Sequence, residues 1–257
     1  MATFTGSIRS EALQGNTWVQ VLLPDGSTRA DKPYPVVYLL HGTTGNSADW
    51  TRFTRLPLYA LEHGVAVIIP EIGNTWAKNI PDRGQFFDYL VDELPDLMGG
   101  LFNFSRKREE TAVMGASSGA YAALKCALSR PEQYGFCGAF STASVFLREY
   151  LDDLRAQKPE EMENPHLRAV YGPNLTCSEE DVLPELAQKA SQSPVRPGLY
   201  LTIGKQDFLY GPNQDFKKVL SALPLDFEME EWEGGHDWYF WDESVKRALA
   251  RFSKMLG

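Results

Sequence analysis

Continuous apolar runs alternate with amphipathic segments along most of this chain. The runs are typical of strands buried on both faces of a parallel sheet, whereas the segments between them repeat apolar residues at helical spacing. The pattern predicts strands at Val36–Leu40, Val65–Pro70, Thr111–Gly115, Phe136–Phe140, Leu199–Gly204 and Phe227–Trp232. It predicts helices at about Leu56–His63, Gln85–Leu101, Ser118–Ser129, Asn213–Leu223 and Trp238–Met255. This alternation indicates an α/β fold with a mainly parallel central sheet and helices on both faces.

The N-terminal residues follow a different pattern. Thr3–Arg9 and Thr17–Leu23 alternate polar and apolar residues, and the turn sequence PDGS at Pro24–Ser27 ends the second run. Alternation bounded by turn residues is typical of antiparallel strands with one solvated face. The sheet is therefore expected to begin with an antiparallel hairpin.

The interval between the fourth and fifth predicted parallel strands is longer than one crossover helix requires. It carries amphipathic segments at Val145–Gln157, His166–Tyr171 and Glu179–Ala190 but no strands of its own. We interpret residues 142–197 as a helical cap inserted into a single domain that spans residues 1–257. Its many charges (REYLDDLRAQKPEEMEN) indicate a solvated face.

Charge and composition exclude several classes of function. The 257 residues include 25 Lys and Arg against 34 Asp and Glu, a formal net charge of −9. Binding to nucleic acids or anionic membranes depends on clustered cations, so we expect neither partner. No apolar stretch reaches the roughly 18 residues that a membrane span needs. Four scattered histidines form no HExxH motif, and we expect no metal and no cofactor.

The cysteines bear on the compartment. Cys126, Cys137 and Cys177 cannot all pair within one chain, and none belongs to a CxxC motif. The N-terminal sequence has neither the basic start nor the apolar run of a secretory signal. We therefore expect free thiols and a cytoplasmic location.

The segment GASSG carries the most informative chemistry. Gly115 to Gly119 match the pattern G-x-S-x-G, directly after an apolar strand and before a helix that starts with small residues. In this context the pattern is typical of a sharp strand-to-helix turn that exposes a serine hydroxyl. Ser117 is therefore the candidate nucleophile, although a glycine-rich packing turn would give the same pattern.

A serine nucleophile needs a base, and the base needs a carboxylate to orient it. His236 lies in GGHDW after the last predicted strand, and Asp207 lies in GKQDFLY after the strand before it. Their order along the chain, acid and then base after the serine, suits a nucleophile at this kind of turn. We predict His236 as the general base and Asp207 as its partner, while a turn or capping role for Asp207 is the simpler alternative.

A fourth element is a donor pair for a developing oxyanion. The sequence HGTTGN follows the first predicted parallel strand and resembles loops that donate a backbone N–H to such a charge. We predict the backbone amides of Thr43 and Ser118 as the donors, because Ser118 begins the helix after the nucleophile.

Together, LLHGTTGNSADW, GASSGAYAALKCAL, GKQDFLY and GGHDWYFW resemble the bacterial tributyrin-esterase group of the α/β-hydrolase fold. That group is related to esterase D, an S-formylglutathione hydrolase, and to acetyl and feruloyl esterases. The resemblance implies a Ser-His-Asp carboxylesterase for short acyl chains, with Ser117, Asp207 and His236 at the triad positions and Thr43 and Ser118 at the oxyanion positions. It also implies a homo-oligomer, a dimer or tetramer. Similar enzymes often carry Met where this chain has Ser118.

Three functions remain open at this point. The first is a serine esterase whose partner is a small-molecule ester, with Trp50 and Trp238 in the substrate pocket because both follow the predicted catalytic loops. The second is a thioesterase of the S-formylglutathione type, whose anionic substrate would call for basic residues at the pocket mouth. The residues available for that role are Arg52, Arg55, Lys78 and Arg83. The third is a binding protein that has the fold without the activity.

Overall fold

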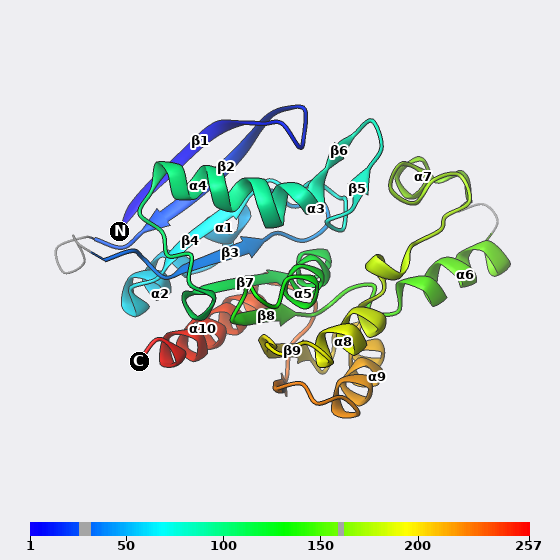
Figure 1. Ribbon diagram of the computed structural model, residues 1–257. Coiled ribbons are helices and arrows are strands. Elements are labelled where there is room, and N and C mark those ends of the chain that lie inside the picture. The colour runs from blue at the N-terminus through cyan, green and yellow to red at the C-terminus, as the bar shows by residue number, and fades with distance from the viewer. Residues whose placement is uncertain (26–31, 159–161) are drawn as a thin grey trace.

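One eight-stranded sheet forms the centre of the computed structural model, which describes residues 1–25, 32–158 and 162–257 (Figure 1). Its strands, in their order across the sheet, are β1 (Ala2–Ser10), β2 (Gly15–Leu23), β4 (Ala66–Pro70), β3 (Val36–Leu40), β7 (Thr111–Ala116), β8 (Phe136–Phe140), β9 (Gly198–Gly204) and β10 (Phe227–Trp232). The pairs β1–β2 and β2–β4 are antiparallel and all other pairs are parallel. The predicted sheet and its antiparallel start are confirmed.

Two details of the strands differ from the sequence pattern or lie beyond it. A separate short hairpin, β5 (Asn79–Ile80) with β6 (Gly84–Gln85), is too brief to leave a periodic signal. Gly26 and Ser27, the second half of the predicted PDGS turn, lie outside the described residues.

Helices cover both faces of the sheet. In chain order they are α1 (Asp49–Phe53), α2 (Leu56–His63), α3 (Phe86–Asp88), the π-helical turn η2 (Tyr89–Glu93), α4 (Leu94–Leu101), the 3-10 turn η3 (Arg108–Glu110), α5 (Ser118–Ser129), α6 (Leu147–Gln157), α7 (Pro165–Tyr171), the 3-10 turn η5 (Glu179–Asp181), α8 (Leu183–Ser191), α9 (Tyr210–Ser221) and α10 (Trp238–Met255). Alternate residues of the central strands enter two separate apolar cores, one shared with α2 and α10 and the other with α4, α5 and α8. None of the described helices combines the length and apolar character that crossing a bilayer would require.

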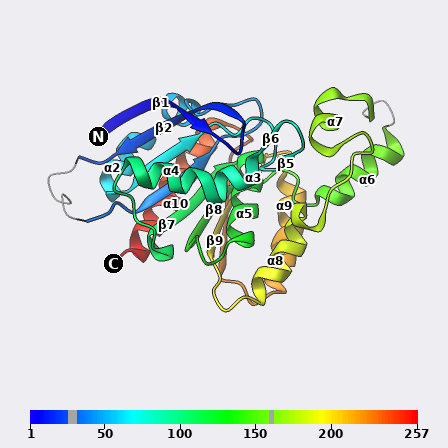
Figure 2. The ribbon, with the colours of Figure 1, turned by 45° about the horizontal axis from the view of Figure 1, so that its top comes forward.

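The predicted cap contains two different parts. Figures 1 and 2 show α6 and α7 projecting beyond the sheet, whereas α8 lies beside α5 and contacts both α5 and α9. Of the residues in α6, only Leu147, Leu151 and Leu154 are buried. The projecting part is thus confined to α6 and α7, and α8 is an ordinary layer helix. The boundaries 142–197 of the insertion stay a prediction.

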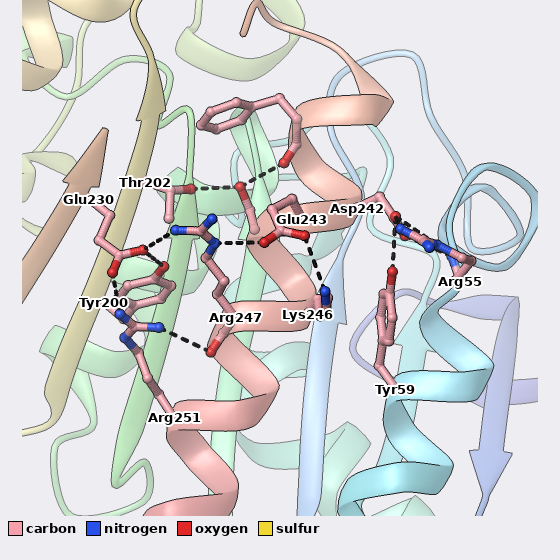
Figure 3. A network of polar contacts seen from close by, with 12 residues as sticks. Arg55, Tyr59, Tyr200, Thr202, Glu230, Asp242, Glu243, Lys246, Arg247 and Arg251 are labelled. Carbon is pink, nitrogen blue, oxygen red and sulfur yellow. Dashed lines mark hydrogen bonds and ion pairs between the residues drawn. The ribbon is translucent and has the colours of Figure 1, made fainter. Parts of the chain in front are cut away.

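A network of ion pairs fixes α10 against the edge of the sheet (Figure 3). Arg247 and Arg251 of α10 both bind Glu230 of β10, with Arg247 Nη1 3.0 Å from the carboxylate. On the other side of α10, the guanidinium of Arg55 lies 2.7 Å from the carboxylate of Asp242. These contacts hold α10 against β10 and Arg55, and the loop that carries His236 comes immediately before this helix.

Candidate active site

Ser117 occupies a strained turn between β7 and α5, with φ at 56° and ψ at −121°. Such a backbone conformation is costly for a residue with a side chain and persists only where its surroundings enforce it. A Cβ atom at Gly115 would lie 2.4 Å from the carbonyl oxygen of Gly119, and one at Gly119 would lie 2.5 Å from that of Leu40. Glycine is therefore required on both sides of the serine, which explains the motif.

The three predicted side chains form one hydrogen-bonded chain. His236 Nε2 lies 3.0 Å from Ser117 Oγ, and His236 Nδ1 lies 2.9 Å from Asp207 Oδ2. Asp207 follows β9 and His236 follows β10, so both loops leave the same edge of the parallel sheet. The loops touch at Gly204 and Gly234, where a Cβ atom at position 204 would lie 2.2 Å from the carbonyl oxygen of Gly234.

Asp207 is buried, and its surroundings favour the ionised carboxylate. Burial by itself raises the pKa of this carboxyl, but hydrogen bonds from His236, from the amide of Leu209 and from the hydroxyl of Ser141 outweigh it, and the pKa is lowered from its ordinary value of 3.8. A carboxylate that stays ionised holds the Nδ1 proton and orients Nε2 toward Ser117.

Ser141 is a site residue that the sequence analysis missed. It is fully buried after β8 with φ at 51°, and its hydroxyl oxygen accepts a hydrogen bond from Trp241 Nε1 at 3.2 Å while the hydroxyl donates to Asp207. Its place directly after a predicted strand was visible in the sequence, but its orientation toward Asp207 was not.

The loop after β3 packs against the nucleophile turn. A Cβ atom at Gly42 would lie 3.3 Å from that of Ser117, and the hydroxyl of Thr43 donates to that of Ser118 at 2.9 Å. Within the described ranges, no acceptor contacts the backbone amide of either Thr43 or Ser118. Two amides are thus left available beside the serine, at the N-terminus of α5 where the helix dipole favours negative charge.

His41 shapes this loop and does not contact the serine. Its side chain is fully buried, with Nδ1 2.9 Å from the carbonyl oxygen of Gly42 and Nε2 2.8 Å from the carboxylate of Glu71. Since these contacts occupy both ring nitrogens, His41 is not placed to act as a base toward Ser117.

Ser117 and His236 open into a cavity of about 910 Å³. Its aromatic lining consists of Phe146, Tyr150, Phe208, Trp238 and Trp241. Trp238 is therefore in the pocket, as the sequence suggested. Among the described residues, no three His, Cys, Asp or Glu side chains gather as metal ligands would.

The pocket assignment of Trp50 is wrong. Its side chain is fully buried, and its Nε1 donates to the carbonyl oxygen of Leu40 at 3.1 Å. Its ring and that of Trp238 are perpendicular and meet edge to face, with their centroids 5.2 Å apart. Trp50 lies on α1, a five-residue helix that turns it into the core, and it supports the pocket wall from behind.

Comparison with known proteins agrees with this geometry. The Esterase family model matches residues 10–252. An acetyl esterase of Caldicellulosiruptor saccharolyticus is 27% identical over an alignment of 272 positions, which covers 99% of each chain. Among solved structures, FphF, a fluorophosphonate-binding serine hydrolase of Staphylococcus aureus, is 28% identical with a TM-score of 0.85 and 98% of each chain covered. The S-formylglutathione hydrolase FrmB of the same organism is 27% identical with a TM-score of 0.84 and the same coverage.

A ferulic acid esterase shares the fold at lower identity, 17%, with a TM-score of 0.78 over 99% of this chain and 98% of the other. The match of the family model covers all but the two ends of the chain, and the similar structures share the whole architecture described above. The chain therefore belongs to the Esterase family and is a serine carboxylic ester hydrolase with the α/β-hydrolase fold.

Proposed function

We propose that this chain hydrolyses short-chain acyl esters, of the acetyl to butyryl type, through an acyl-enzyme on Ser117. The observation that carries the proposal is the chain of hydrogen bonds from Ser117 through His236 to Asp207, at 3.0 and 2.9 Å, which opens into the large cavity. Ser117 is the nucleophile in this proposal, His236 the general base and Asp207 the residue that fixes the imidazole tautomer.

The geometry supports a two-step mechanism. Ser117 Oγ attacks the ester carbonyl while His236 Nε2 takes the hydroxyl proton, and the amides of Thr43 and Ser118 stabilise the oxyanion. Collapse of the tetrahedral intermediate breaks the bond to the alcohol, which leaves with the proton from His236. Water then attacks the acyl-enzyme, gives its proton to the same nitrogen and releases the acid, with Ser117 restored.

The substrates we propose are short-chain acyl esters, including those of acetylated carbohydrates, and also feruloylated carbohydrates. The cavity is several times larger than an acetyl group needs, and its aromatic walls suit a sugar or phenolic ring. The similarity to an acetyl esterase supports the acyl part of this proposal.

A thioesterase of the S-formylglutathione type is the second candidate. The similarity to FrmB favours it, since a thioester requires the same attack and the same proton transfers. The two candidates differ in the leaving group, which is an alcohol in one case and glutathione, with its two carboxylates, in the other. The charge of the cavity therefore distinguishes them.

The test combines covalent labelling with a substrate panel. We expect a fluorophosphonate probe to modify Ser117, located by peptide mass spectrometry, and to abolish p-nitrophenyl acetate hydrolysis. The panel compares p-nitrophenyl acetate, butyrate and octanoate with methyl ferulate, acetylated xylo-oligosaccharide and S-formylglutathione by kcat/KM. Labelling at another residue, or kcat/KM that rises toward octanoate, would contradict the proposal.

We also propose a cytoplasmic location, which the cysteines support. Cys126, Cys137 and Cys177 are free thiols, and burial raises the pKa of the Cys126 thiol to about 12, so it stays protonated and unreactive.

A further inference from the structure

The cavity that contains Ser117 is lined by acidic side chains. Asp49, Glu149, Asp153 and Asp237 border it, whereas no Lys or Arg does so among the described residues. Two of these carboxylates serve the backbone: that of Asp49 accepts from the amide of Asn46 at 3.0 Å, and that of Asp237 caps α10 through the amide of Phe240 at 3.0 Å.

The other two have no such role. Glu149 and Asp153 are exposed, lie four residues apart on α6 and so share one face of the helix, and face the cavity. Within the part of the chain that the structure describes, neither carboxylate has a hydrogen bond or ion pair. Carboxylates are negatively charged at neutral pH, so α6 presents to the site two negative charges that have no ion-pair partner among the described residues.

The cations that could offset this charge are engaged elsewhere. Arg148, next to Glu149 in sequence, binds Glu185 of α8. Of the basic residues considered for an anionic substrate, Arg55 binds Asp242 and Lys78 binds Asp181. Arg83 borders a separate cavity near β5 and β6, and Arg52 does not border the catalytic one. None of the four basic residues available for an anionic substrate therefore borders the catalytic cavity.

The position of the two charges indicates which part of a substrate they meet. Ser117 is only 9% exposed, and an acetyl group is two carbons long, so it stays beside the serine in the inner part of the cavity. Only the alcohol part of an acetyl ester is long enough to reach the outer rim on α6. Aromatic side chains also line the cavity, and the faces of aromatic rings attract ammonium groups as carboxylates do.

We propose that Glu149 and Asp153 select the alcohol part of the ester by its charge. Esters of cationic alcohols are preferred over neutral ones of the same shape, and esters with an anionic alcohol part are rejected. Glutathione, with two carboxylates, belongs to the rejected class. This inference rests on the proposed esterase function and adds the substrate class to it.

Three acetyl esters that differ in the charge of the alcohol test the proposal: acetylcholine, its neutral isostere 3,3-dimethylbutyl acetate, and 3-sulfopropyl acetate. At low ionic strength we expect kcat/KM to fall by about 5- to 10-fold from cation to neutral ester and again to the anion, as two partly screened charges would produce. The preference should decline toward 0.5 M salt, where the Debye length is about 4 Å.

In the double variant Glu149→Gln, Asp153→Asn, kcat/KM for acetylcholine should be nearly equal to kcat/KM for 3,3-dimethylbutyl acetate. Asp152→Asn is the matched control, because Asp152 is on the same helix, does not border the cavity and binds Arg155 within α6. In this control, the ratio of kcat/KM for acetylcholine to kcat/KM for 3,3-dimethylbutyl acetate should equal that of the unmodified enzyme.

The outcomes separate this inference from the function on which it rests. If 3,3-dimethylbutyl acetate is hydrolysed and the charged esters follow no order, or the double variant keeps the order, the charge selection is wrong and the esterase function stands. If none of the three esters nor p-nitrophenyl acetate is hydrolysed, both proposals fail.

Discussion

The two walls of the catalytic cavity are held in different ways. The wall that carries Asp207 and His236 consists of loops at the ends of the paired strands β9 and β10, and ion pairs hold α10, which follows the His236 loop, against β10 and Arg55. The opposite wall, α6, projects from the sheet and buries only three leucines. Proton transfer requires distances near 3 Å, which the sheet enforces, whereas selection by charge tolerates looser placement. The molecule thus separates the reaction from the choice of substrate.

A buried ion cluster anchors the segment that follows α6 and α7 to α5. The carboxylate of Asp181 lies 2.8 Å from the ammonium of Lys125 on α5 and also binds Lys78. Lys125 in turn donates to the carbonyl oxygen of Ala77 at 3.0 Å. The chain that returns from α6 and α7 is therefore anchored to the same helix that begins at the nucleophile turn. This arrangement suggests variants that disturb one wall and spare the other.

The largest effect is expected at Ser117. Ser117→Ala removes the nucleophile and should lower kcat for p-nitrophenyl acetate by about 10⁶. Because the change removes one oxygen, the free energy of unfolding in urea should stay within about 1 kcal/mol of the original. Residual turnover above a thousandth of the original rate would show that another group attacks the ester.

The second largest effect is expected at Asp207. Asp207→Asn keeps the shape of the side chain but removes the charge that fixes the imidazole tautomer, and kcat should fall by about 10⁴. The matched control is Asp215→Asn on α9, whose carboxylate forms an exposed ion pair with Lys218. A loss as small for Asp207→Asn as for this control would refute the assignment.

The third variant removes the charge of Asp181 from the buried ion cluster. Asp181→Asn leaves Lys125 buried without its carboxylate and should cost about 3–5 kcal/mol in free energy of unfolding. Glu180→Gln, at an exposed neighbouring position, should cost less than about 0.5 kcal/mol. Activity toward p-nitrophenyl acetate at 25 °C should change less than about threefold, since the triad is unaltered.

The pH dependence of stability gives a second readout of this anchor. Burial raises the pKa of Asp181, but the two lysines outweigh it and lower the pKa well below 3.8. A carboxyl with a lowered pKa contributes stability that is present above its unfolded value and lost as pH falls below it. We therefore expect the difference in unfolding free energy between the original chain and Asp181→Asn to shrink as pH is lowered from 5 toward 2. A difference independent of pH would contradict this role.

The smallest effect is expected at Ser141. Ser141→Ala removes one hydrogen bond to the Asp207 carboxylate, and such a bond to a charged group is worth about 1.5–3 kcal/mol, so kcat should fall by about 10- to 150-fold with KM nearly constant. A change confined to KM, or to thermal stability, would show that Ser141 only fills space.

The catalytic side of the cavity, with Asp207 and His236, could be predicted from the sequence more completely than the side formed by α6. Apolar runs mark most of the parallel strands, and glycines near Ser117 and His236 mark the turns at strand ends, so residues far apart in sequence could be placed at one sheet edge. The orientation of a side chain depends on tertiary packing, which no local pattern encodes. For that reason Trp50 was placed in the pocket, Ser141 was missed, and the acidic face of α6 was interpreted as a solvated surface.

The contact between Gly204 and Gly234 limits how this enzyme can diverge. At this crossing a single methyl group would overlap the carbonyl of Gly234, at 2.2 Å, and force apart the loops of the acid and the base. Substitutions around the cavity can change which esters enter. A substitution at Gly204, by contrast, would end turnover although no reacting atom is changed. Descendants with a larger residue there must have rebuilt one of the two loops or given up catalysis.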